Sequence, residues 1–165
     1  MLLTFFSFFK FIKKNRKCKL THEKKEKFIK NFCETIDSTY IIDKINDKNN
    51  KILFYLINNS FTNLINETVG VIIYRIISNN RNLLRIYISL ISIHKKMRSK
   101  GYGTLILKDF VSYFKNYKNK KKEIVLLSLP SSYQFYKGFG FKECHSKYIE
   151  KNELINENIY MKFIF

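Results

Sequence analysis

The sequence predicts one α/β domain with a mixed, mostly antiparallel twisted sheet and flanking helices. Three observations support this fold class. Segments with period-two hydrophobicity follow one another before residue 94, a helical period of about 3.6 residues begins after residue 102, and a buried strand follows that helix. We assign residues 17–165 to the domain and treat residues 1–16 as an apolar and basic extension.

The first elements expected along the chain are two helices and two strands. Thr21 can cap a helix that runs to about Cys33, and a second short helix is expected over Ser38–Ile45. The segments "KILFYLI", from Lys51, and "TVGVIIYRII", from Thr68, are typical of strands closed by Asn-rich turns. We expect them to form an antiparallel meander with the strand that follows.

That next strand, Leu83–Ile93, changes its hydrophobic phase. Leu84, Ile86, Ile88 and Leu90 occupy even positions, whereas Ile91 and Ile93 occupy odd positions. A β-bulge near Leu90 would produce such a slip, because one extra residue turns the following side chains to the other face. A strand buried on both faces would give the same pattern, so both interpretations stay open.

A glycine-rich loop, "MRSKGYGTLIL", joins this strand to a helix. Glycines let an anionic group approach the N–H groups and the positive dipole of a first helical turn. A dinucleotide-binding loop is excluded because Ile106 stands where a third small residue is needed, and no P-loop Gly-Lys-Ser/Thr follows. The remaining pattern, Arg98-x-x-Gly101-x-Gly103, indicates a phosphate-binding loop or a plain turn. The helix that it enters has one apolar stripe, formed by Ile106, Leu107, Phe110, Val111 and Phe114.

The C-terminal part completes the alternation of helices and strands. A buried strand is expected over Glu123–Leu129. The segment "PSSYQFYKGFGF" then predicts a short helix that stops at a glycine. Two final strands are expected at about Phe141–Ile149 and Asn158–Phe165.

The net charge of +18 would ordinarily favour nucleic acid as a partner. However, Lys, Asn, Ile, Phe and Tyr are all abundant and Trp is absent, which is the residue set encoded by A- and T-rich codons. The lysines are also scattered and form no basic stripe with interleaved aromatics. We therefore attribute the charge to codon bias and do not expect a nucleic-acid partner.

The cysteine content and the hydropathy of the chain indicate its cellular compartment. Cys18, Cys33 and Cys144 are odd in number and far apart, which argues against a disulfide framework or a metal cluster. The segment Leu2–Ile12 is too short to span a membrane and makes a poor secretory signal. We expect a protein of the cytoplasm without a transmembrane segment; a nuclear location and a weak membrane-surface contact through the N-terminus stay open.

From Leu83 to Lys142 the chain resembles the GNAT superfamily of N-acetyltransferases. The segment "ISIHKKMRSKGYGTLIL" is similar to the family's acetyl-CoA loop, and "YQFYKGFGF" is similar to its later helix, where a Phe-Tyr pair precedes a Gly-Phe. The first 80 residues match the family only in the order of their elements.

The resemblance implies a role for each matching position. The backbone at Ile91 and Ile93 would pair with the pantetheine arm, and Tyr136 would protonate the departing thiolate. No metal is implied. The N–H groups of one continuous loop would hold the pyrophosphate of acetyl-CoA, and the loop consists of Arg98, Ser99, Lys100, Gly101, Tyr102, Gly103 and Thr104.

The sequence departs from the family at two positions. Tyr87 stands where histone-acetylating members carry a glutamate base, and Leu129 stands where many members carry an asparagine beside the cofactor. His94 follows the strand directly, but its place matches a non-catalytic position, so we expect a solvated histidine. The general base is therefore not identified.

We expect an acetyl-CoA-dependent N-acetyltransferase that passes the acetyl group directly to a primary amine. The acceptor could be a protein lysine, a protein N-terminus or a small amine. A covalent intermediate is not expected, because no cysteine falls in either motif. A catalytically weak or inactive CoA-binding or interaction module is the alternative, and a basic nucleic-acid-binding protein is a weaker one.

Overall fold

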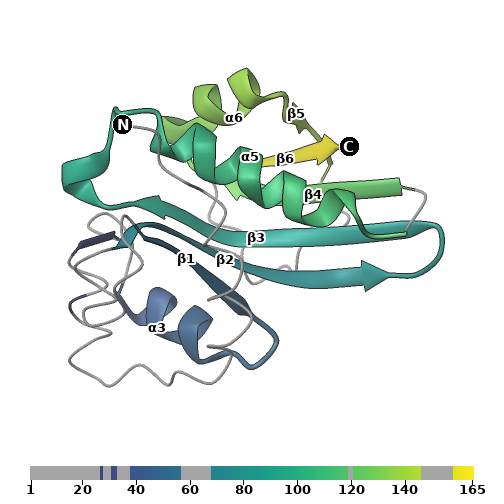
Figure 1. Ribbon diagram of the computed structural model, residues 1–165, viewed down its shortest axis with the longest axis horizontal. Coiled ribbons are helices and arrows are strands. Elements are labelled where there is room, and N and C mark those ends of the chain that lie inside the picture. Colours follow the sequence, from purple (N-terminus) through teal and green to yellow (C-terminus); the bar gives the residue numbers. More distant parts are fainter. Residues whose placement is uncertain (1–26, 28–30, 33–37, 57–67, 119–120, 146–157) are drawn as a thin grey trace. The chain divides into compact units, whose positions relative to one another are not determined.

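The computed structural model of the 165-residue chain describes residues 27, 31–32, 38–56, 68–118, 121–145 and 158–165. This part of the chain contains both helices and strands (Figure 1). In chain order the elements are α3 (Ser38–Asn46), β1 (Lys51–Leu56), β2 (Thr68–Asn79), β3 (Leu83–Ile93), the 3-10 helix η3 (Lys95–Met97), α5 (Tyr102–Lys115), β4 (Lys121–Ser128), the 3-10 helix η4 (Pro130–Ser132), α6 (Tyr133–Phe139), β5 (Lys142–Glu143) and β6 (Ile159–Ile164).

The strands form one mixed sheet in the order β1-β2-β3-β4-β6-β5. β2 and β3 are joined by a tight turn in which the backbones of Asn80 and Leu83 bond each other at 3.0 and 3.3 Å. β3 and β4 run parallel, and their pairing extends to Ile88↔Leu126. β6 pairs antiparallel with both β4 and β5. The predicted fold class, a mixed and mostly antiparallel sheet with flanking helices, is therefore confirmed.

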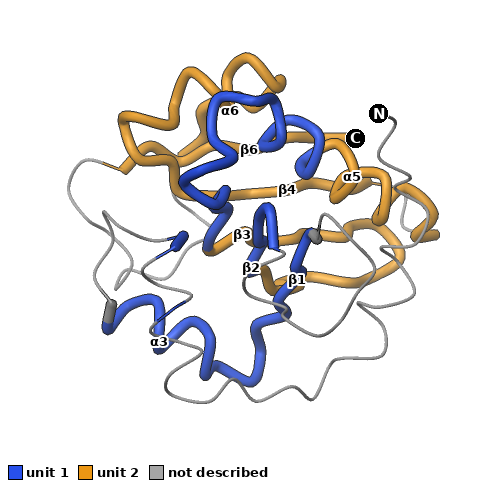
Figure 2. Tube along the Cα trace, turned by 60° about the vertical axis from the view of Figure 1, so that its left-hand side comes forward, with its two compact units in different colours: residues 1–73, 90–107 blue, residues 74–89, 108–165 orange. Residues whose placement is uncertain are grey.

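The chain folds into two compact units (Figure 2). The first unit comprises Met1–Ile73 and Leu90–Leu107, and the second comprises Tyr74–Ser89 and Lys108–Phe165. In the first unit α3 packs on the sheet through Ile41. The buried members of this core are Phe32, Ile41, Val71, Ile73 and Leu90, and the half-buried residues around it are Tyr40, Ile45, Ile52 and Phe54.

Aromatic rings dominate the core of the second unit. The ring of Tyr74 on β2 contacts Phe110 and Phe114 of α5 edge-on, at centroid distances of 5.1 and 5.7 Å. Phe163 on β6 contacts Phe141 at 5.3 Å, which anchors the segment after α6 to the sheet. All five residues of the apolar stripe predicted for α5 are buried.

Contacts of β3 agree with the predicted phase slip. The guanidinium of Arg75 lies 5.2 Å from the ring centroid of Tyr87, so these two side chains share a face of the sheet. Leu90 packs with Val71 and Ile73, and these β2 residues alternate in phase with Arg75. The burial pattern of β3 also loses its alternation, because Ile86, Tyr87 and Ile88 are all buried. A β-bulge near Leu90 stays a prediction.

Most expected elements have the predicted bounds. α3 covers the helix expected over Ser38–Ile45, and β3 has the expected limits. β4 begins at Lys121, earlier than the expected Glu123, because β3 offers pairing partners from Leu83 onward.

The strand expected over Phe141–Ile149 is shorter in its described part, because β5 covers only Lys142–Glu143 and only β6 pairs with it. Residues 146–149 lie outside the described residues. Of the helix expected over Thr21–Cys33, residues 27 and 31–32 are described, and they are helical. The extension assigned to residues 1–16 also lies outside the described part.

Gly70 on β2 allows the start of α5 to approach the sheet closely. A Cβ atom at this position would lie 2.5 Å from Cδ1 of Ile106, 2.8 Å from Cδ1 of Ile93 and 3.2 Å from the carbonyl oxygen of Ser92. The two isoleucine methyl groups can rotate away, but the backbone carbonyl cannot. The absence of a side chain at Gly70 therefore determines how α5 is seated in the first unit.

We expect Gly70→Ala to lower the free energy of unfolding by about 1–3 kcal/mol, the usual cost of overpacking. Ile106→Val removes the methyl group closest to the new Cβ. The double variant should therefore lose less stability than the sum of the two single variants, as measured by urea unfolding. Strictly additive losses would show that the contact at Gly70 does not limit the packing.

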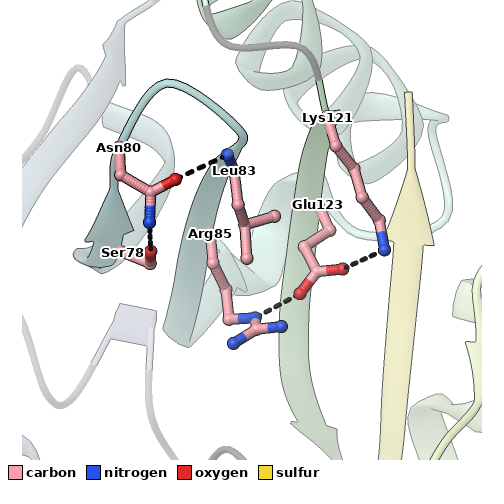
Figure 3. A network of polar contacts seen from close by, with 6 residues as sticks. All are labelled: Ser78, Asn80, Leu83, Arg85, Lys121 and Glu123. Carbon is pink, nitrogen blue, oxygen red and sulfur yellow. Dashed lines mark hydrogen bonds and ion pairs between the residues drawn. The ribbon is translucent and has the colours of Figure 1, made fainter.

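A buried ion pair ties β3 to β4 in the second unit (Figure 3). Arg85 and Glu123 are direct register partners, and Nε of Arg85 donates to Oε1 of Glu123. Glu123 is only 3% exposed, while Lys121 is 53% exposed and places its Nζ 3.6 Å from Oε2. The parallel pairing of β3 and β4 therefore contains a buried carboxylate that pairs with both Arg85 and Lys121.

Removal of one member of this pair should cost more than removal of both. Glu123→Leu is expected to lower the free energy of unfolding by about 3–5 kcal/mol, because it removes the buried carboxylate to which Nε of Arg85 donates. The double variant Arg85→Met/Glu123→Leu should recover most of that loss. Lys121→Ala, at the exposed end, is the control and should change stability by about 0–1 kcal/mol. Equal losses for single and double variants would contradict the pairing.

Candidate functional site

The loop that follows β3 is fixed to the sheet by its first residue. The N–H of His94 donates to the carbonyl of Val69 at 2.8 Å, and Met97 N–H donates back to the His94 carbonyl at 2.7 Å. Nδ1 of His94 accepts from the N–H of Lys96 at 3.3 Å and so caps η3. The imidazole ring packs edge-on against Phe32, with 5.3 Å between centroids. His94 is therefore half-buried, whereas the sequence predicted a solvated side chain.

The surroundings of His94 favour the neutral form of its ring. Partial burial lowers its pKa, and the nearby charges of Lys96, Lys95 and Arg98 lower the pKa further. A neutral ring is needed for Nδ1 to accept the backbone hydrogen bond of the cap. This bond gives His94 a structural role in shaping the loop.

Left-handed backbone conformations shape the loop between η3 and α5. Gly101 has φ +79°, and Ser99 has φ +60°, which is unusual for a residue with a side chain. An ideal Cβ on Gly101 would meet nothing within 4 Å, so conformation and not crowding favours glycine there. Strained backbone of this kind is concentrated at ligand-binding sites.

A hydrogen bond from the Arg98 side chain links the loop to strand β3. Its Nε donates to the carbonyl of Ile93 at 3.1 Å. Ile91 and Ile93 are both half-buried and lie beyond the last β3–β4 pair, Ile88↔Leu126. The strand positions and the loop predicted to contact acetyl-CoA are therefore consecutive parts of one continuous backbone segment in the first unit.

The first turn of α5 presents backbone donors beside a group of cations. The first helical bond runs from Leu105 N–H to the Gly101 carbonyl at 3.2 Å, so the N–H groups of residues 102–104 have no acceptor inside the helix. Gly103 lies within this turn. The exposed side chains of Lys95, Lys96 and Lys100 add positive charge, and the sequence has no acidic residue from 94 to 108. This arrangement suits a multiply charged anion such as a pyrophosphate.

Tyr136 belongs to the second unit, whereas the loop from Arg98 to Thr104 belongs to the first. It lies on α6, is 8% exposed, and its ring contacts Phe135 and Phe141 at 5.1 and 5.5 Å. Burial raises the pKa of its phenol well above the ordinary tyrosine value. The hydroxyl therefore remains protonated at physiological pH, and its raised pKa also makes it a weaker proton donor than an ordinary tyrosine.

Tyr87 and Leu129, the two positions that depart from the family pattern, both lie in the described part of the chain. Tyr87 is 2% exposed and lies beneath the Arg75 guanidinium, so no carboxylate stands at this strand position. Leu129 is 38% exposed, and its carbonyl accepts the hydroxyl of Ser128 at 2.9 Å. Tyr87 therefore does not supply the carboxylate, and the Leu129 side chain does not supply the amide, that the family pattern has at these positions.

Several features were not predicted from the sequence. The left-handed Ser99 gives no sequence signal, because serine is common in ordinary turns. Gly70 interrupts a strand pattern, which does indicate a close approach of another group. Among the described residues, no group of three His, Cys, Asp or Glu side chains could hold a metal ion. No helix in the described part of the chain is long and apolar enough to cross a membrane.

Comparison with known proteins adds a family and a fold. Residues 18–156 match the family described as an acetyltransferase (GNAT) domain. No curated protein sequence matches the chain. Among solved structures, Tetrahymena GCN5 is similar with a TM-score of 0.66 and 15% identity, over 87% of this chain and 89% of that one.

Two further structures have the same fold. Ard1 from Thermoplasma volcanium gives a TM-score of 0.54 and 17% identity, over 85% of this chain and 92% of that one. A chain of the NatC complex bound to Gag peptide and CoA gives 0.52 and 16%, over 87% and 91%. At these identities the likeness concerns the fold.

Proposed function

The chain belongs to the GNAT acetyltransferase family, and from that premise we propose that it transfers an acetyl group from acetyl-CoA directly to a primary amine. The observation that carries this proposal is the loop from Arg98 to Thr104. Its left-handed Ser99 and Gly101 lead directly into the unpaired N–H groups of α5, amid lysine side chains. We assign the pyrophosphate of acetyl-CoA to this loop and the pantetheine arm to the backbone at Ile91 and Ile93.

The reaction needs two proton transfers. An alkylamine with a pKa of about 10.4 is neutral in only about one molecule in 10³ at pH 7, so it must lose a proton before it attacks the thioester carbonyl. When the C–S bond breaks, the thiolate takes a proton. We assign that donation to Tyr136, whose buried phenol stays protonated. The proton lost by the amine passes to water, since Tyr87 occupies the strand position of the missing carboxylate.

The acceptor remains a primary amine of a protein lysine, a protein N-terminus or a small molecule. A CoA-binding module without turnover is the alternative, favoured by the absence of a carboxylate at Tyr87. The two proposals differ in one result: both predict acetyl-CoA binding, and only the first predicts release of CoA thiol in the presence of an amine.

The assignment of the pyrophosphate to the loop can be tested by a substitution that disfavours the backbone conformation of Gly101. Gly101→Val places a β-branched residue at φ +79°, which costs about 1–2 kcal/mol in the present conformation. The loop should relax away from that geometry and weaken acetyl-CoA binding by about tenfold or more, as measured by calorimetric titration. Gly138→Ala is the control, since Gly138 lies in α6 with open space around it and has no positive φ. An unchanged affinity in folded Gly101→Val would refute this site.

Tyr136→Phe retains the ring and its packing but removes the proton. We expect kcat to fall by about 10²–10⁴, the usual contribution of a general acid, while acetyl-CoA affinity stays nearly unchanged. Because burial raises the pKa of Tyr136, the fall should be uniform between pH 7 and about pH 9, with no new alkaline limb.

Tyr133→Phe is the matched control for this variant. It also removes a phenol hydroxyl from α6, one that donates to Glu143 at 2.6 Å. Its kcat should equal that of the wild type. If Tyr136→Phe also turns over at the wild-type rate when chemistry is rate-limiting, Tyr136 is a packing residue only.

A further inference from the structure

His94 connects the end of β3 to the loop assigned to acetyl-CoA. It is the residue from which η3 starts, and η3 ends at Arg98, the first residue of that loop. The backbone of His94 is bonded in both directions, because its N–H donates to the Val69 carbonyl and its carbonyl accepts from the Met97 N–H. The direction in which the chain leaves the sheet therefore depends on the conformation of this one residue.

The side chain of His94 is held by two contacts. Its ring packs edge-on against Phe32, and its Nδ1 accepts from the N–H of Lys96. Phe32 is 2% exposed, and its carbonyl accepts the hydroxyl of Ser92, two residues before His94. The phenyl ring is thus fixed to the end of β3. A rotation of the imidazole would lose either the contact with this ring or the hydrogen bond that caps η3.

The hydrogen bond of the cap uses a nitrogen that can also bind a proton. A neutral imidazole has one acceptor nitrogen, whereas both nitrogens of the charged ring are donors. After protonation the N–H at Nδ1 would face the N–H of Lys96, and two donors cannot bond each other. The cap is therefore complete only while the ring is neutral.

We propose, on the basis of the function proposed above, that His94 is a positioning residue for the acetyl-CoA loop, and that protonation of its ring weakens acetyl-CoA binding. The ring does not touch the reacting atoms in this proposal. It acts through η3, whose geometry determines where Arg98 and the left-handed Ser99 and Gly101 lie.

The groups around the imidazole determine the pH range of this effect. Partial burial lowers the pKa of the ring, and the charges of Lys96, Lys95 and Arg98 lower that pKa further. The described residues that contact it from other elements, Phe32 and Val69, are uncharged. The cap is therefore complete above about pH 6.5, the ordinary pKa of histidine, and is lost as the pH falls through the lowered pKa.

A second effect of protonation has the opposite sign. A charged imidazole adds a cation near the loop, and a cation alone would strengthen the binding of an anion. An interaction between charges near the surface is weakened by solvent, whereas two donors that face each other lose their hydrogen bond outright. We therefore expect the loss of the cap to dominate, so that acid weakens binding.

The first experiment compares two amide substitutions at pH 8 by calorimetric titration with acetyl-CoA. In His94→Asn, Oδ1 can accept from the N–H two residues on, as in an Asx turn, so the affinity should stay within about threefold of the wild type. In His94→Gln the amide lies one bond further from the backbone, beyond the position of Nδ1. This variant should bind acetyl-CoA about tenfold more weakly. Equal affinities of the two variants would overturn the positioning role.

The second experiment varies the pH. The pKa of His94 is first measured from its ring resonances by NMR, and acetyl-CoA affinity is then compared at pH 8 and at one pH unit below that pKa. The wild type should lose about tenfold relative to His94→Asn, and this ratio cancels the protonation of the ligand's own phosphates. His145→Asn is the control and should keep the wild-type response, because His145 belongs to the second unit. The same response in the wild type and His94→Asn, or tighter binding by the wild type in acid, would overturn the proposal.

The third experiment tests the cap without any ligand. The backbone amide resonance of Lys96 should titrate with the His94 ring in the wild type and should not do so in His94→Asn. A Lys96 amide that does not respond to the ring would overturn the proposal. If that titration is observed but the wild type binds no acetyl-CoA at any pH, the cap is real and the proposed function is wrong.

Discussion

Strand β3 pairs with β4 only as far as Ile88 and Leu126, and the proposed chemistry depends on this limit. Before it, the buried pair of Arg85 and Glu123 holds the two strands in register. Beyond it, β3 continues through Ile91 to Ile93. A sheet that stayed paired throughout would use the backbone groups of this segment for its own hydrogen bonds, and none could serve a ligand.

The loop after β3 presents backbone N–H groups that can donate hydrogen bonds to an anion. Its shape is determined by contacts within the chain: His94 caps η3, Arg98 holds the Ile93 carbonyl, and Ser99 and Gly101 adopt left-handed conformations. Gly70 lets the first turn of α5 lie close to the sheet in the same unit. The backbone donors are therefore positioned before any ligand arrives, which lowers the entropy that binding would otherwise cost.

The sequence predicted features that depend on hydrophobic periodicity or on a local motif. The limits of β3, the apolar stripe of α5 and the phase slip near Leu90 follow from the order of apolar residues alone. Strand register could not be obtained from periodicity, so the pairing of Arg85 with Glu123 and the end of the β3–β4 pairing at Ile88↔Leu126 were not predicted. Whether Tyr136 and the loop residues act as assigned stays a prediction.

Direct transfer of an acetyl group is tested most simply by a single-turnover experiment. The protein, in excess over acetyl-CoA labelled in its acetyl group, is mixed with a peptide that has a free α-amine, and the position of the label is followed with time. We predict that the label moves from acetyl-CoA to the peptide nitrogen in one phase and is never attached to the protein. A labelled protein that forms and then decays would contradict direct transfer. Label that stays in bound acetyl-CoA with every amine offered would contradict transferase activity itself.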